Sequence, residues 1–174
     1  MSLTDRCTPR VLILVACLAT IGCYRVTKQA AVTMLAGGPE RSWLGDTVRL
    51  SYAENTGGFL SLGADLPVER RTFVFTAVTG VLLLGLTLVA VRARWQGARL
   101  FGAALFVAGG ASNWVDRLVT GSVIDFINIG IGPLRTGIFN VADVAIMTGV
   151  ALIVATRTHA SADHGSRPTE GGRS

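Results

Sequence analysis

The chain has 174 residues, of which 50% are hydrophobic and 16% are charged, and its mean hydropathy is +0.51. Soluble domains carry about 25% charged residues, so this composition argues against an ordinary soluble domain and indicates a small integral membrane protein. The formal net charge is +5. Several arginines stand near the ends of apolar runs, which is how membrane topology is encoded, and no nucleic-acid partner is expected.

Cysteine and histidine do not form the pattern of a metal centre. The three cysteines, Cys7, Cys17 and Cys23, lie near the N-terminus without the spacing of a disulfide framework or of metal ligands. His159 and His164 both lie in a polar C-terminal tail. A histidine metal site or a Ser/His triad inside the membrane therefore lacks its parts.

The first apolar run predicts a membrane helix over residues 11–30. Charge is absent from Val11 to Tyr24, and the basic side chains of Arg25 and Lys28 that follow are long enough to reach the membrane surface. An alternative interpretation is a lipoprotein signal peptide that ends at Cys17 and is cleaved. The apolar run before Cys17 is short and continues past it, so the membrane helix is preferred.

Residues 31–71 mix charge, glycine and short alternation. Gly37 to Pro39 ends the preceding helix. The alternation of apolar and polar residues from Val48 to Tyr52 predicts a strand at the level of the membrane surface. The segment from Asn55 to Phe59, which reads NTGGF, is typical of a tight turn when considered alone.

Three more apolar runs predict three more membrane helices. Thr72 to Val91 carries no charge and would cover about 30 Å, the thickness of the hydrocarbon layer. Leu100 to Val115 follows a short basic loop, and Gly137 to Thr156 carries Asp143 as its only charge before the tail. The third run also holds small residues that allow close helix contact, namely Gly102, Gly109, Gly110, Ala111 and Ser112.

Arginine placement orients these four spans. The N-terminal segment, the loop with Arg92, Arg94 and Arg99, and the tail that starts at Arg157 fall on one side, which the positive-inside rule makes cytoplasmic. The N- and C-termini are therefore expected in the cytoplasm. The connections over residues 31–71 and 116–136 are expected on the extracytoplasmic side.

The predicted fold is an all-α membrane protein with four transmembrane helices and a small β-containing extracytoplasmic cap. Residues 1–156 form its single domain. Residues 157–174 are small and polar, which predicts a disordered cytoplasmic tail.

Polar residues gather between Gly109 and Asp143, in segments that are otherwise apolar, where an ionisable group is costly unless it is paired or used. The run VIDFINI over residues 123–129 predicts a short strand, and the glycines after it let the chain fold back over the helix ends. The side chains expected to meet near the outer membrane surface are Asp116, Arg117, Asp125 and Asp143. By spacing, Asn113 shares a helix face with Asp116 and Arg117, and Asn140 shares one with Asp143.

Asp125 and Asp143 differ from the other polar residues because each is flanked by apolar residues and neither has a basic neighbour in sequence. Two carboxyls in one water-limited pocket do not both ionise cheaply, so they share a proton and can activate water while protonating a carbonyl. The alternative is that each aspartate caps a helix or a loop. For Asp116 and Arg117 a structural ion pair is an alternative, and for Asn113 and Asn140 interhelical hydrogen bonding is one.

These residues resemble the lipoprotein signal peptidase family, also called signal peptidase II, of bacterial intramembrane aspartic peptidases. GGASNWVDRLVTGSVIDFI resembles the glycine-rich Asn-x-x-Asp-Arg segment of the family and its Val-x-Asp-Phe motif, and FNVAD resembles its Phe-Asn-x-Ala-Asp motif. NTGGF is similar to the outer-loop Asn-x-Gly motif of the family. The likeness covers residues 10–156.

The resemblance implies an enzyme of the inner membrane that cuts prolipoproteins before their diacylglyceryl-modified cysteine, with Asp125 and Asp143 as its catalytic dyad. It implies prolipoprotein substrates, membrane lipids as surroundings, a monomer, and no metal or cofactor. The positions that would support the site or hold substrate are Asn55, Gly57, Asn113, Arg117 and Asn140.

Two departures from the family pattern bear on substrate preference. The first helix of the family usually ends in Asp-x-x-Thr-Lys, and here Thr27 and Lys28 match while Tyr24 replaces the acid. The outer-loop motif also has one small residue fewer before Phe59 than is common in the family. Neither departure touches the two aspartates.

Two other functions fit some of these features. Intramembrane aspartate pairs also carry ions, which would make the chain a small ion- or proton-coupled transporter. The clustering of the acids at one surface, and the absence of an evident internal repeat, argue against this. An inert binder of lipidated peptides is the third possibility.

Overall fold

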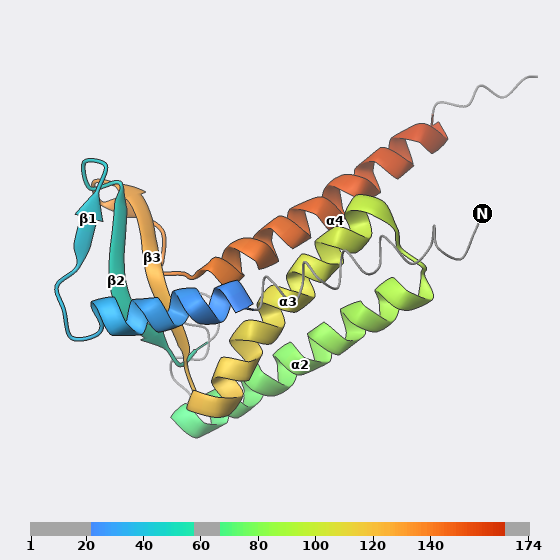
Figure 1. The fold of residues 1–174 in the computed structure, drawn as a ribbon. Coiled ribbons are helices and arrows are strands. Elements are labelled where there is room, and N and C mark those ends of the chain that lie inside the picture. Colours follow the sequence, from blue (N-terminus) through green and yellow to red (C-terminus); the bar gives the residue numbers. More distant parts are fainter. Residues whose placement is uncertain (1–21, 58–66, 166–174) are drawn as a thin grey trace, which may run out of the picture.

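The computed structural model describes residues 22–57 and 67–165 (Figure 1). Residues 11–21 of the first predicted span, the signal-peptide interpretation at Cys17, and the last residues of the NTGGF turn lie outside the described residues. The described part is a bundle of long helices with a small antiparallel sheet at one end, as Figure 1 shows. The expected small β-containing cap is therefore present.

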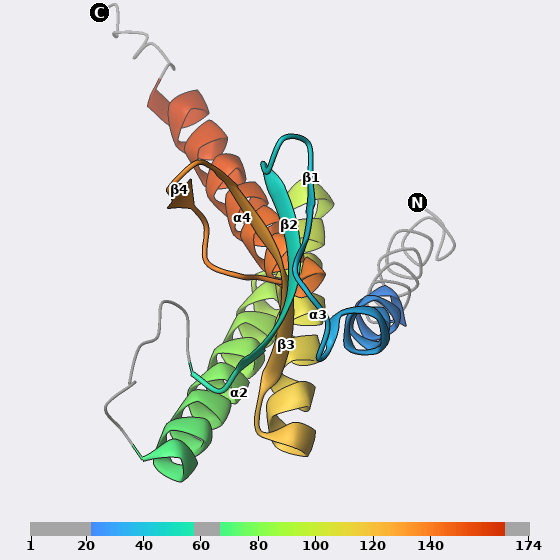
Figure 2. The same ribbon diagram turned by 90° about the vertical axis from the view of Figure 1, so that its left-hand side faces the viewer.

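A helix over residues 22–35 extends the first predicted span beyond Ala30. It ends where Gly37 adopts a positive φ of 71°, a conformation that glycine reaches at no steric cost. Its inner face packs Ala31 and Leu35 against Phe126 of the sheet. Figure 2 shows this helix on one side of the sheet end and α2 on the other.

The three long helices are α2 (Val68–Arg92), α3 (Gly97–Thr120) and α4 (Val141–Gly165). Within the described residues one stretch, Phe73–Arg92, is long and apolar enough to cross a membrane, and the apolar helical stretch Val141–Thr156 is shorter. The predicted count of four spans therefore stays a prediction.

Several boundaries differ from the sequence expectation: α2 begins at Val68 rather than Thr72, and α3 ends at Thr120 rather than Val115. Arg99, expected in the basic loop, lies in the first turn of α3. The fourth helix begins at Val141 rather than Gly137, because the residue before Val141 caps it from outside the helix. The helix then continues to Gly165, so the tail predicted to be disordered from residue 157 begins as helix.

Glycines bring α3 and α4 into close contact, as the third apolar run predicts. A Cβ on Gly109 would lie 2.6 Å from the backbone oxygen of Ala142, and a Cβ on Gly102 would lie 2.8 Å from that of Gly149. Both distances are too short for a side chain, so glycine is required at these crossings. The start of α4 is thereby held against the middle of α3.

The sheet has the strand order β1-β2-β3-β4, and all of its neighbouring strands are antiparallel. Its strands are β1 (Arg41–Trp43), β2 (Val48–Asn55), β3 (Val123–Ile131) and β4 (Leu134–Arg135). The strands expected around Val48 to Tyr52 and over residues 123–129 are confirmed as β2 and β3. Their register sets Asn55 opposite Val123 and Ala53 opposite Asp125. Asn55, the first residue of the NTGGF turn, is thereby brought beside the strand that carries Asp125.

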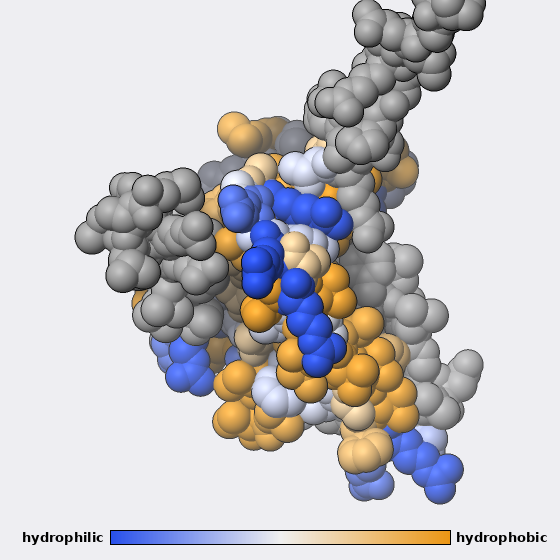
Figure 3. Space-filling view, turned by 90° about the vertical axis from the view of Figure 1, so that its right-hand side faces the viewer, coloured by the Kyte–Doolittle hydropathy of each residue, from blue (hydrophilic) through white to orange (hydrophobic). Residues whose placement is uncertain are grey.

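Large apolar side chains remain exposed along α2. Among the residues that Figure 3 colours, in the view from the right-hand end of Figure 1, hydrophobic residues lie on both sides of a line of hydrophilic ones. Apolar exposure of this extent on one helix is typical of a surface that faces lipid or another protein. The exposed apolar residues of α2 include Phe73, Val81, Leu82, Leu84 and Val91.

Candidate active site

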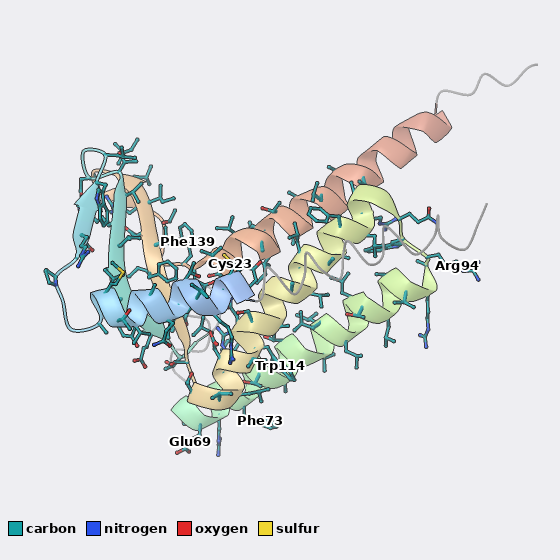
Figure 4. All side chains as sticks on the ribbon, in the orientation of Figure 1. Cys23, Glu69, Phe73, Arg94, Trp114 and Phe139 are labelled. Carbon is teal, nitrogen blue, oxygen red and sulfur yellow. The ribbon has the colours of Figure 1, made fainter. Side chains whose placement is uncertain are left out.

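The polar residues singled out from the sequence come together where β3, α3 and the start of α4 meet. The backbone of Phe139 pairs with that of Ile127, with N–H···O distances of 2.8 and 2.9 Å in the two directions. This pairing ties the segment before α4 to β3 and sets Asn140 beside Asp125. Figure 4 labels Phe139 between the sheet and the beginning of α4.

Asp125 lies in β3 and is 3% exposed. Its Oδ1 accepts a hydrogen bond from Nδ2 of Asn140 at 2.6 Å, and its Oδ2 accepts one from Nδ2 of Asn55 at 3.0 Å. Both amides are oriented by backbone N–H groups, since Gly57 donates to Oδ1 of Asn55 and Ala142 donates to Oδ1 of Asn140. The contacts that position Asp125 are therefore neutral amides.

Burial raises the pKa of the Asp125 carboxyl above its ordinary value. The hydrogen bonds from Asn55 and Asn140 oppose this shift, and the nearby negative charge of Asp143 adds to it. A carboxyl whose pKa is raised in this way can hold a proton closer to neutral pH, which is what proton transfer to a substrate requires.

Asp143 lies in the first turn of α4 and shares a reciprocal cap with Asn140. The side chain of Asn140 accepts hydrogen bonds from the backbone N–H groups of Ala142 and Asp143, while Oδ2 of Asp143 accepts one from the backbone N–H of Asn140 at 2.9 Å. This is a capping box, and it places a carboxylate where the helix dipole favours negative charge. The capping alternative therefore describes one contact of Asp143.

Capping does not account for the second oxygen of Asp143. Its Oδ1 accepts a hydrogen bond from Nδ2 of Asn113 in α3, at 2.9 Å. Nδ2 of Asn140, which binds Asp125, also lies 3.3 Å from Oδ1 of Asn113. The two aspartates are thus joined through two amides, one from α3 and one from the residue that caps α4, and Asn140 is completely buried.

Lys28 is a member of this cluster that the sequence interpretation missed. Its side chain was expected at the membrane surface, but it is only 5% exposed, and Nζ lies 2.7 Å from Oδ1 of Asn113 and 2.5 Å from Oδ2 of Asp116. The basic partner of Asp116 is therefore Lys28 and not its neighbour Arg117. The match of Thr27 and Lys28 to the family motif was the signal that could have drawn attention to this residue.

Arg117 connects α3 to the outer turn. Its guanidinium donates to the backbone oxygen of Gly57 at 3.0 Å and to that of Asn113 at 3.4 Å. Gly57 is buried, and the side chain of Asn55 binds its N–H. Arg117 therefore fixes the turn that delivers Asn55 to Asp125.

Tyr24, which replaces the usual acid of the family, is 2% exposed and packs against Ala142 and Ala145. It therefore supports the turn of α4 that carries Asp143. Within the described residues, no group of three or more His, Cys, Asp or Glu side chains is arranged to hold a metal ion.

Comparison with known proteins identifies relatives of this architecture. The family model for signal peptidase (SPase) II matches residues 16–158. The chain is 28% identical to a lipoprotein signal peptidase of Streptococcus pneumoniae over 149 residues, covering 83% of this chain and 91% of that protein. It is 30% identical to a lipoprotein signal peptidase of Brevibacillus brevis over 129 residues, covering 74% and 82% respectively.

Two solved structures, each described as a bacterial membrane enzyme, share the fold. One aligns with a TM-score of 0.76 and 21% identity over 93% of this chain and 94% of that one. The other aligns with a TM-score of 0.71 and 25% identity over 84% and 92% of the two chains. The helices and the small sheet described above are therefore arranged as in these membrane enzymes.

Proposed function

We propose, from the premise that this chain belongs to the signal peptidase II family, that it removes signal peptides from prolipoproteins by cutting before the diacylglyceryl-modified cysteine. Membership of the family makes the chain a signal peptidase and a bacterial membrane enzyme. The observation that carries the proposal is the junction of Asp125 and Asp143 through Asn140 and Asn113. It is an arrangement of two carboxyls held by neutral donors.

The proposed chemistry is general acid and base catalysis by this pair. One carboxylate takes a proton from water while the oxygen of that water forms a bond to the scissile carbonyl carbon, and the other carboxyl donates its proton to the carbonyl oxygen. The tetrahedral intermediate then collapses and the C–N bond breaks, as the leaving amine takes the proton that the first carboxyl removed from water and the second carboxylate takes a proton back from a hydroxyl of the intermediate. Because the two carboxyls are coupled, the shared proton belongs to the pair.

Five other residues are proposed to support the site. Asn113 and Asn140 orient the two carboxyls through the hydrogen bonds described above. Arg117 and Gly57 hold the outer turn, and Asn55 reaches from that turn to Asp125.

We further propose that residues 1–156 form one domain with four membrane spans and with both termini in the cytoplasm. The apolar stretch Phe73–Arg92 and the exposed apolar surface of α2 support membrane insertion. The sheet and the first turn of α4, which carries Asp143, lie at the end of the bundle opposite the connection between α2 and α3 (Figure 1), where Figure 4 labels Arg94. The positive-inside rule then assigns the site to the extracytoplasmic face, where the diacylglyceryl chains of the substrate stay in lipid. We propose a monomer as the active unit.

The test is cleavage of a diacylglyceryl-modified prolipoprotein peptide in detergent by the wild type, Asp125→Asn and Asp143→Asn at equal folded amounts. We expect the wild type to release a product that begins with the modified cysteine, and both variants to lose at least about 10²-fold to 10⁴-fold in kcat. A peptide with an unmodified cysteine serves as the substrate control. Unchanged cleavage in either variant would move the chemistry to other residues, and flux in proteoliposomes by a wild type that does not cleave would favour a transporter.

A further inference from the structure

Lys28 is a buried cation close to the aspartate pair, and the proposed chemistry gives it no role. Burying an ammonium group is costly unless it is paired and hydrogen-bonded. The carboxylate of Asp116 supplies the pairing charge, and its side chain keeps 20% of its surface exposed. The second contact of Lys28, at 2.7 Å from Oδ1 of Asn113, is not needed to neutralise the charge.

The chemistry of the ammonium group decides which way the Asn113 amide faces. An ammonium group has three donors and no acceptor, so the amide atom that faces Lys28 is the oxygen. The amide nitrogen of Asn113 then faces Oδ1 of Asp143, at 2.9 Å, and donates to it. If the amide were turned over, its oxygen would face a carboxylate oxygen, and its N–H groups would face an ammonium group.

The same amide oxygen also reaches the second aspartate through Asn140. Nδ2 of Asn140 lies 3.3 Å from Oδ1 of Asn113 and 2.6 Å from Oδ1 of Asp125. Oδ1 of Asn140 is occupied by the backbone N–H of Ala142, so this amide has a fixed direction as well. One donor on Lys28 therefore sets the direction of the Asn113 amide, which donates to Asp143 and whose oxygen also binds the Asn140 amide that donates to Asp125.

We propose that Lys28 is a positioning residue of the peptidase, whose ammonium group orients the Asn113 amide and thereby holds Asp143 and Asp125 in the geometry of a working pair. Lys28 acts through Asn113 and does not touch the substrate. The inference rests on the proposed function, because it takes the two aspartates to be the reacting groups. It assigns the ion pair with Asp116 the separate task of making the burial of Lys28 tolerable.

The first variant removes the donor without leaving a lone buried charge, because Lys28→Met is combined with Asp116→Asn. We expect kcat for the lipidated peptide to fall about 10-fold to 100-fold with KM changed less than about threefold, since the reacting groups lose their alignment while substrate contacts remain. Asp116→Glu keeps both the charge partner of Lys28 and the bond from Lys28 to Asn113, and should stay within about threefold of the wild type in kcat. Lys28→Arg keeps a cationic donor and should recover most of the loss.

Arg25→Met is the matched control, because Arg25 is an exposed cation on the same helix. It should behave as the wild type. If Asp116→Glu loses as much kcat as the double variant, the geometry of the ion pair is what matters and the proposal is overturned. An unchanged kcat in the double variant overturns it as well.

A double-mutant cycle separates positioning from a general effect on the fold. Because Lys28 acts through Asn113, adding Lys28→Met to Asn113→Ala should lower kcat by less than about twofold beyond Asn113→Ala alone. Losses that multiply would show that Lys28 acts by another route. Wild type and Asp125→Asn are measured in the same assay, so an inactive wild type or an active Asp125→Asn counts against the proposed function and is distinguished from a failure at Lys28.

Discussion

Asp125 and Asp46 are two aspartates of the sheet region with opposite surroundings. Asp125 is buried and binds the neutral amides of Asn55 and Asn140. Asp46 has a side chain that is 45% exposed, and it binds Arg49 at 2.7 Å, with Arg135 at 3.5 Å. Hydrogen bonds from Arg49 hold the pKa of the Asp46 carboxyl well below its usual range, whereas burial raises the pKa of Asp125.

The contrast shows how a carboxyl is positioned with or without being locked in its charged form. Arginine fixes the geometry of Asp46 and stabilises its negative charge at the same time. The amides around Asp125 fix its geometry while burial keeps proton binding within reach. Both clusters are ordered by hydrogen bonds, but only the cluster around Asp125 has the electrostatics of an acid and base catalyst.

The largest loss of activity is expected from removing the side chain of Asn140, which binds Asp125 and caps the helix that carries Asp143. Asn140→Ala takes the donor from Asp125 and the cap from α4, so we expect kcat to fall about 10²-fold or more and stability to fall by about 1 to 2 kcal/mol. Ser42→Ala removes the matching neutral donor of Asp46, which is bound at 2.7 Å, and should leave kcat unchanged. Peptide cleavage and chemical unfolding in detergent measure the two effects. Equal losses of kcat in the two variants would erase the distinction between the clusters.

A smaller effect is expected in the pH dependence of stability. Because the folded-state pKa of Asp125 is raised, its contribution to stability is complete below the ordinary carboxyl pKa, near 4, and is lost as pH rises through the folded-state value. The pKa of Asp46 is lowered, so its contribution is complete above the ordinary value and is lost as pH falls. The two aspartates therefore give slopes of opposite sign.

Thermal unfolding midpoints of the wild type, Asp125→Asn and Asp46→Asn, measured from about pH 3 to pH 7, test these slopes. Asp125→Asn should remove part of the loss of stability with rising pH above about pH 4, and Asp46→Asn should remove part of the loss below it. A slope above pH 4 that is the same in Asp125→Asn and in the wild type would contradict the assignment of a raised pKa to Asp125.

Much of the fold could be predicted because hydropathy and alternation report burial directly. The charge-free run from Thr72 to Val91 predicts α2, and the alternation from Val48 to Tyr52 predicts β2. The start of α4 could not be placed in this way. The residues from Gly137 are apolar enough to be predicted as the first turn of the helix. The helix instead begins at Val141, because the side chain of Asn140 accepts hydrogen bonds from the first helical N–H groups.

The candidate site could be predicted in composition but not in its connections. Asp125 and Asp143 stand out because carboxyls are rare in apolar segments. The bond from Asn55 to Asp125 depends on the register of β2 against β3, which no local pattern encodes. Lys28 was misplaced because a cation at the end of an apolar run usually reaches the membrane surface, and only the packing of its helix against α3 shows that it points inward.

The most direct measurement is kcat/KM for a diacylglyceryl-modified prolipoprotein peptide with Asp125→Asn and Asp46→Asn at equal folded amounts. Both substitutions remove one carboxyl from the sheet region, so they differ in surroundings rather than in chemistry. We predict that Asp125→Asn loses at least about 10²-fold, as expected for a lost general acid or base, while Asp46→Asn cleaves as the wild type does. Retained cleavage by Asp125→Asn would contradict the account.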